Sequence, residues 1–177
     1  MRAVVSSIEA EHRRYKRLGE GAIAQLDRAG LTARPPGEGN SVAVIVWHLA
    51  GNLKSRFTDF LTADGEKPWR DRESEFGARD VGPDEVVAKW DEGWDVLLSA
   101  ISALADGDLS RTVRIRGQEL SVAEALHRSL AHASYHVGQI VFLARSLRGG
   151  AWEFLTIPPG GSEQYNRNPT REKGPSA

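Results

Sequence analysis

The sequence contains no cysteine, which excludes disulfide bonds and thiolate metal ligands. Any bound metal ion must therefore be held by histidine, carboxylate or water. Residues 1–18 carry charges throughout and lack the apolar segment that a signal peptide requires. No run of residues reaches the ~18 apolar positions that a membrane-spanning helix needs. These absences predict a soluble cytoplasmic protein with no membrane partner.

The chain also has little net charge, because its 23 basic and 24 acidic residues give a formal charge of −1. Binding to nucleic acid is driven by clustered positive charge, so we expect no nucleic-acid partner. A local basic run at Arg13, Arg14, Lys16 and Arg17 is more typical of a solvated helix face than of a phosphate site. With 177 residues the chain has the length of one domain with its own core.

Apolar residues at three- and four-residue spacing predict four long helices, at residues 3–29, 41–61, 83–105 and 121–147. Asn40 is the expected N-cap of the second helix, and Pro83 suits the first turn of the third. Ser121 and Glu124 form a capping box at the start of the fourth helix. Between the last two helices, residues 112–120 alternate in a way that indicates a short extended turn or hairpin.

Four helices of this length with two longer connections predict an all-α fold, a four-helix bundle. The bundle domain is expected to cover residues 1–166, and residues 167–177 are expected to form a mobile tail. The connection at residues 62–81 is polar and irregular, and a connection this long usually carries function or spans the domain. Four apolar residues after the last helix are expected to anchor the chain to the bundle: Trp152, Phe154, Leu155 and Ile157.

Two histidines in the fourth helix are the main candidates for metal ligands. His132 and His136 are four residues apart, so they differ by ~40° around the helix axis and ~6 Å along it. Their imidazoles therefore share one face and can bind one ion. The same spacing also arises on a solvated face, or as two hydrogen-bonded core histidines. The position of this pair beside an apolar helix face that must be buried places it next to the interior.

His48 is the natural third ligand, because it lies within the most apolar helical run of the chain. An unpartnered imidazole would be costly there, although a core histidine with one hydrogen-bond partner also fits. Asn52 and Gln139 lie one turn or less from the ligands and could orient an imidazole or a bound ligand, or equally support a helix contact. His12 is expected to pack or to support the site, and His127 to face the surface or a helix contact.

Three histidines with an open coordination position are typical of a reactive metal site rather than a closed structural one. Neutral imidazoles leave the ion electrophilic, so it could lower the pKa of a bound water or thiol. Imidazole suits zinc, nickel, copper and iron alike. Because binding requires neutral imidazoles, metal affinity is expected to fall as the pH drops through the histidine range near ~6.5.

The chain resembles the DinB-like (damage-inducible) superfamily, which includes the bacillithiol S-transferases. Proteins of that superfamily are four-helix bundles with one ligand histidine in the second helix and a His-x3-His pair in the fourth. The matching residues here are His48 in VIVWHLAGN and His132 and His136 in HASYHVGQI. An uncharacterised subgroup shares the longer stretches NSVAVIVWHLAGNLKSRFTDFLTADGEKPWR, HASYHVGQIVFLAR and LTIPPGGSEQYN. The likeness covers about residues 3–166.

The resemblance implies a divalent metal ion, often zinc or nickel, and a homodimer. It also implies transfer of a small-molecule thiol to an electrophile, since characterised relatives catalyse this reaction or use a thiol in isomerisation. No positioned nucleophile or acid/base pair is evident near the histidines, and a thiol that brings its own nucleophile would account for that. A non-catalytic metal- or ligand-binding bundle is the alternative, and a metal-dependent hydrolase is a third. Arg56, two turns beyond His48, could bind a carboxylate of the thiol or form a surface ion pair.

Overall fold

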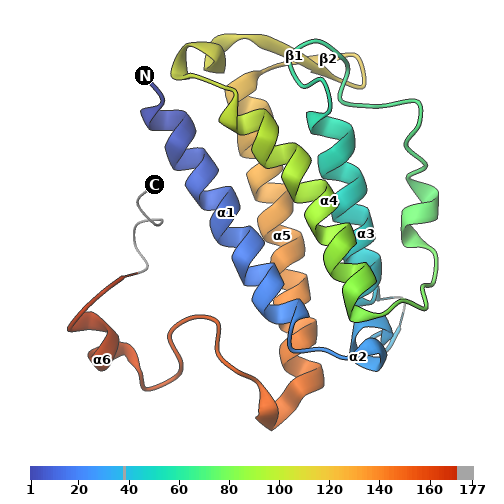
Figure 1. Cartoon of the computed structure of the whole chain (residues 1–177), viewed down its shortest axis with the longest axis vertical. Coiled ribbons are helices and arrows are strands. Elements are labelled where there is room, and N and C mark those ends of the chain that lie inside the picture. Colours follow the sequence, from blue (N-terminus) through green and yellow to red (C-terminus); the bar gives the residue numbers. More distant parts are fainter. Residues whose placement is uncertain (38, 171–177) are drawn as a thin grey trace.

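The computed structural model describes residues 1–37 and 39–170, and these form a bundle of four long helices with a two-stranded hairpin at one end and an extended C-terminal segment (Figure 1). The predicted mobile tail lies partly outside the described residues, since residues 171–177 are not among them. None of the described helices combines the length and the apolar character needed to cross a bilayer.

The long helices are α1, α3, α4 and α5, and each packs against two of the others. α3 packs most extensively on α4, and α1 on α5, while α1–α4 and α3–α5 contacts close the bundle. The all-α prediction is therefore confirmed. Their bounds are Ala3–Ile23 for α1, Val42–Phe57 for α3, Pro83–Ser102 for α4 and Val122–Arg148 for α5.

Shorter elements connect the long helices. The predicted hairpin is present, with β1 (Thr112–Ile115) paired antiparallel to β2 (Gln118–Ser121). Its turn residues Arg116 and Gly117 both have positive φ, which is typical of a two-residue hairpin turn. The remaining short helices are α2 (Arg28–Thr32), α6 (Ser162–Asn166) and the 3-10 turns η1 (Glu73–Phe76), η2 (Asp106–Ser110) and η3 (Gly149–Ala151).

Three predicted boundaries of the first two helices are wrong. The first helix ends at Ile23 rather than near residue 29, because Asp27 caps a separate short helix by accepting a hydrogen bond from the Gly30 N–H at 2.9 Å. The second helix is capped by Ser41 instead of Asn40 and ends at Phe57, four residues early. The Ser121–Glu124 capping box is confirmed, with both reciprocal hydrogen bonds present.

One connected apolar core runs through the bundle. α3 is buried nearly all round in its first half, as its uninterrupted apolar run predicts. α3 and α4 pack closely at Gly93, where an added Cβ would lie 2.6 Å from the Ala50 Cα. The fully buried Trp90 and Trp94 pack beside this contact on α4. The close approach fixes how α3, which carries His48, sits in the bundle.

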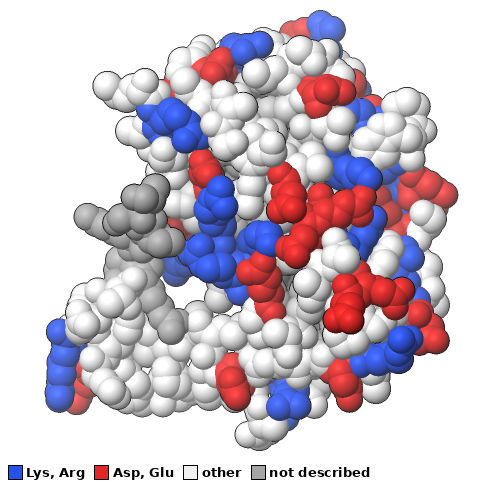
Figure 2. Space-filling view, in the orientation of Figure 1, with Lys and Arg blue, Asp and Glu red and all other residues white. Residues whose placement is uncertain are grey.

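The C-terminal segment is anchored by fewer residues than expected. Trp152 and Leu155 pack against the core, but Phe154 and Ile157 are exposed. Gln25, in the turn that follows α1, holds the backbone of Glu153 through two hydrogen bonds, of 2.9 and 3.0 Å. The exposed residues follow this clamp, where the chain leaves the bundle (Figure 1). On the face shown in Figure 2, acidic and basic side chains are interspersed among the described residues rather than segregated by sign.

Candidate metal centre

His48, His132 and His136 meet between α3 and α5, although 84 residues separate the first two in the sequence. One ring nitrogen from each lies within 4.8 Å of the others. The Nε2 atoms of His132 and His136 are 3.2 Å apart. The sequence-predicted ligand set is therefore brought together in one cluster that could hold a metal ion.

The geometry of this cluster fits a tetrahedral ion. Zinc–imidazole bonds of ~2.0–2.1 Å place two nitrogen ligands ~3.3 Å apart, close to the His132–His136 separation. The His48 nitrogen must approach the other two by up to about 1.5 Å to complete the set. A shift of this size is within the reach of imidazole side chains that turn slightly on their helices.

Burial keeps two of the imidazoles neutral, which is the form that binds metal. Burial, and after it the neighbouring His136, His48, Arg70 and Arg56, together lower the pKa of His132 to about 3. Burial also lowers the pKa of His136, against a hydrogen bond to Gln139 that raises it. These two ligands therefore compete with protons at a lower pH than the ~6.5 expected from the sequence.

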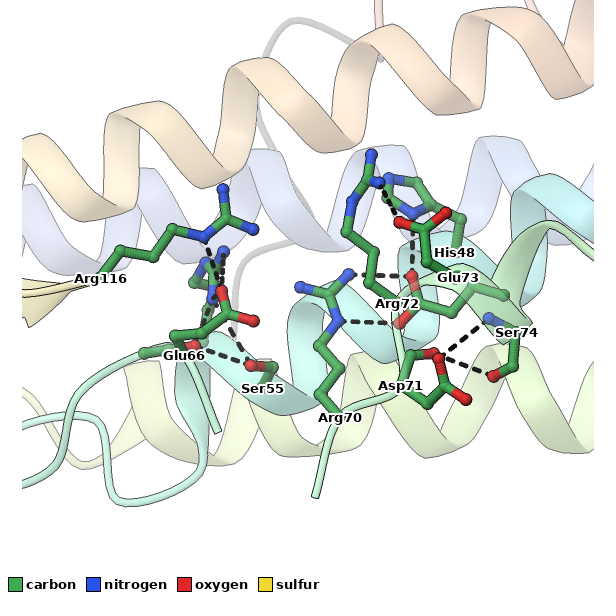
Figure 3. A network of polar contacts seen from close by, with 12 residues as sticks. His48, Ser55, Glu66, Arg70, Asp71, Arg72, Glu73, Ser74 and Arg116 are labelled. Carbon is green, nitrogen blue, oxygen red and sulfur yellow. Dashed lines mark hydrogen bonds and ion pairs between the residues drawn. The ribbon is translucent and has the colours of Figure 1, made fainter. Parts of the chain in front are cut away.

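Glu75 orients His48, and sequence reasoning missed it. The Nδ1–H of His48 donates to the Glu75 carboxylate at 2.9 Å, so Nε2 is the ring nitrogen that could bind an ion. Arg70 donates two further hydrogen bonds to the same carboxylate, at 2.8 and 2.9 Å (Figure 3). All three side chains are less than a tenth exposed. Burial raises the pKa of Glu75, but His48 and Arg70 outweigh it and the pKa lies below its ordinary value.

The motif of α3 makes room for this carboxylate. Gly51 follows His48 by three residues, and a Cβ at that position would lie 2.1 Å from the Glu75 Oε1. No side chain other than hydrogen fits there while Glu75 keeps its two partners. Gly51 is therefore part of the site, although it offers no ligand. The segment that carries Arg70 and Glu75 is the polar connection for which the sequence predicted a functional or spanning role.

Of the two residues expected to orient an imidazole or ligand, Gln139 contacts one. Its Oε1 accepts a hydrogen bond from His136 Nδ1 at 2.8 Å, which presents the Nε2 of His136 to the cluster. Asn52 lines the adjoining cavity, and no described residue is its hydrogen-bond partner. The Nδ1 atom of His132 is buried and likewise has no partner among the described residues.

The other two histidines lie outside the cluster. His12 is fully buried on α1, where its Nδ1 contacts the Ile8 carbonyl oxygen at 2.9 Å. Burial lowers its pKa, so it is a neutral core side chain. His127 is exposed on α5. Both therefore remain apart from the ligand set, as the helical spacing indicated for His127.

A cavity of about 640 Å³ opens beside the cluster, and His48 and His132 are in its wall. Phe57, Phe60 and Leu120 give it an apolar side. The only carboxylate among the described residues of the wall is that of Glu119, which pairs with Arg114 at 2.8 Å. An ion held by the three histidines would therefore face a cavity large enough for an organic molecule.

A family model described as "Protein of unknown function (DUF1572)" matches residues 2–161. No curated protein matches the chain. The matched range contains the four long helices, the hairpin and all three clustered histidines. Because the match extends over most of its length, this chain belongs to DUF1572, a DinB-like family.

Proposed function

We propose that this protein is a metal-dependent S-transferase that joins a low-molecular-weight thiol to an electrophile. One observation carries the proposal: a partly buried three-histidine cluster opens into a cavity whose described wall offers no unpaired carboxylate or neutral base outside the cluster. Such a site suits a reaction in which the substrate supplies the nucleophile.

A thiol meets that requirement. A divalent ion bound by the three imidazoles would stabilise the thiolate form of a thiol that reaches it. Glu75 cannot serve as a mobile base, because Arg70 and His48 hold it on both carboxylate oxygens. Its part is to fix the His48 ring. A metal-bound water could also lose its proton to the solvent without a protein base, so the preference for a transferase over a hydrolase rests on the family resemblance.

The protein's own residues also provide for two substrates. The cavity volume exceeds that of a small thiol, so an electrophile can lie beside it. The side chains of Phe57, Phe60 and Leu120 offer an apolar surface on which an electrophile could pack. The DinB-like resemblance to bacillithiol S-transferases supports the same reaction class. From the same resemblance we also propose that the ion is zinc or nickel, that the protein forms a homodimer and that it is cytoplasmic.

The test is conjugation of a model electrophile, 1-chloro-2,4-dinitrobenzene, with bacillithiol, mycothiol or glutathione. We expect turnover with at least one thiol when zinc or nickel is supplied, and loss of turnover with a chelator. The His136→Ala variant should be inactive. The matched control is His127→Ala on the same helix, which removes an exposed imidazole outside the cluster and should keep full activity. Absence of metal-dependent turnover with every thiol would contradict the proposal.

A non-catalytic metal- or ligand-binding bundle is the second candidate, and the lack of an unpaired acid or base in the described cavity wall also fits it. The spectrum of cobalt-substituted protein separates the two. A thiol-dependent sulfur-to-cobalt charge-transfer band supports the transferase. A spectrum that no thiol changes supports a closed, inert site.

A further inference from the structure

The cavity beside the histidines has a strongly cationic wall. Five arginines line it: Arg56, Arg70, Arg72, Arg116 and Arg128. Figure 3 shows three of them, Arg116, Arg70 and Arg72, along a path from the hairpin to His48. Two helices, the hairpin and the connection before η1 all contribute. Such convergence of guanidinium groups on one apolar cavity needs a chemical reason, because like charges repel one another there.

Ion pairs within the protein neutralise only part of the positive charge of these arginines. Arg70 is neutralised by Glu75, and Arg72 pairs with Glu73 at the surface. Arg56 and Arg116 share the single carboxylate of Glu66, at 3.2 and 2.8 Å.

Arg128 and Asp64 also contribute to the balance of positive and negative charge at the hairpin end of the cavity. Arg128 has no ion-pair or hydrogen-bond partner among the described residues. The nearby Asp64 is committed to the backbone, since it accepts from the N–H groups of Glu66, Arg116 and Gly117. With the Arg114–Glu119 pair included, four guanidinium groups at the hairpin end (Arg56, Arg114, Arg116 and Arg128) face three carboxylates (Asp64, Glu66 and Glu119), which leaves an excess of one positive charge.

This charge lies at a fixed distance from the histidine cluster. Arg128 precedes His132 by one turn of α5, and Arg56 follows His48 by two turns of α3, so the rise is ~6 Å and ~12 Å. Phe57, Phe60 and Leu120 belong to the same wall. A molecule that reached from the histidines to the arginines would therefore present an apolar part to these side chains and an anionic group to Arg56, Arg116 and Arg128.

We propose that the arginine end of this cavity binds the carboxylate or phosphate group of a small organic anion, whose apolar part packs on Phe57, Phe60 and Leu120. Guanidinium groups match both oxyanions with paired N–H donors. If the bound anion is the thiol or the electrophile of the reaction, this inference rests on the proposed function. The anion site itself requires no metal ion.

The experiment uses three probes that share one apolar ring system, on the full chain with a chelator present. They are naphthalene-2-carboxylate, 2-naphthyl phosphate and the neutral naphthalene-2-carboxamide, and binding is measured by calorimetry. We expect the carboxylate, the phosphate or both to bind at least about tenfold more tightly than the amide, the scale of one charge-assisted hydrogen bond. Which of the two binds better identifies the oxyanion. Added salt should weaken only anion binding.

Three variants test the location. Arg116→Gln and Arg128→Gln change exposed side chains, so folding should be unaffected, and each should reduce the preference for anion over amide severalfold. The matched control is Arg145→Gln, which removes the same charge from α5 about 25 Å from Arg128 along the helix. It should leave the preference unchanged.

The outcomes separate this inference from the proposed function. Equal affinity for anions and amide, or an equal effect of Arg145→Gln, overturns the anion site. Arginine-dependent anion binding in a protein that shows no metal-dependent turnover supports the anion site and counts against the transferase.

Discussion

The buried Glu75 carboxylate offers the sharpest mutational test, because it joins His48 and Arg70, which have no other counter-ion among the described residues. Glu75→Gln removes the charge and keeps the size of the side chain. The Arg70 side chain, 3 % exposed, would then keep its own charge without a carboxylate. His48 would lose the carboxylate that accepts its Nδ1–H.

The expected loss of stability follows from this burial. Breaking a buried ion pair by neutralising one partner costs about 3–5 kcal/mol. Glutamine can still accept one hydrogen bond, so we expect the lower end, about 3 kcal/mol. For a chain of this length that lowers the Tm by about 6–12 °C. Loss of the residue that orients a ligand should also weaken zinc binding about 10–100-fold.

The pH dependence gives an independent check. The pKa of Glu75 in the folded chain lies below its ordinary value of 4.5. The stabilisation is therefore fully present above pH 4.5 and is lost as the pH falls through the lowered folded pKa. The difference in unfolding free energy between wild type and Glu75→Gln should be constant from pH 7 to about 5 and shrink in stronger acid.

Urea unfolding of the metal-free proteins followed by circular dichroism gives the stabilities, and competition with a chromophoric chelator gives the zinc affinities. The control is Glu73→Gln, two residues earlier in η1, whose side chain is 86 % exposed and pairs with exposed Arg72. It should change stability by less than about 0.5 kcal/mol. If Glu75→Gln behaved like Glu73→Gln in both assays, the assigned role of this carboxylate would be wrong.

Two further predictions concern the room around the site and its protonation. Gly51→Ala should displace Glu75 and weaken zinc binding. The control is Gly138→Ala on α5, where a Cβ meets nothing within 4 Å, and it should stabilise the helix by up to about 1 kcal/mol. Equal effects of the two substitutions on zinc affinity would refute the steric argument. The pKa of His132 is lowered to about 3 in the folded chain, mainly by burial, whereas an unfolded chain has a histidine pKa of about 6.5. Below pH ~6.5 the unfolded metal-free chain therefore binds a proton at His132 that the folded chain does not bind, and this favours unfolding. Urea midpoints of the metal-free protein should therefore drop between pH 7.5 and 5, and a midpoint that stayed constant would contradict a buried neutral His132.

Local patterns were sufficient to predict the fold and the histidine cluster. The three- and four-residue apolar spacing marked four helices, and the capping box at Ser121 fixed the start of α5. The four-residue spacing of His132 and His136 required only that their segment be helical. His48 could be added because an imidazole in an apolar run needs a partner.

The Arg70–Glu75 pair could not be predicted in the same way. Both residues lie in an irregular connection without periodicity, and only the packing of η1 on α3 brings them to His48. The role of Gly51 could not be predicted either, because a glycine in a helix does not reveal which neighbouring side chain occupies the space beside it. The cationic wall is also a tertiary feature, since its arginines come from four separate parts of the chain.

The central claim is that His48, His132 and His136 bind one ion together. X-ray absorption at the zinc edge, on protein purified without an affinity tag and loaded with one equivalent of zinc, tests it most directly. We predict three imidazole nitrogens at ~2.0–2.1 Å from a single ion per chain, and loss of this signal in His48→Ala. A zinc environment without imidazole, or one that His48→Ala leaves unchanged, would contradict the claim.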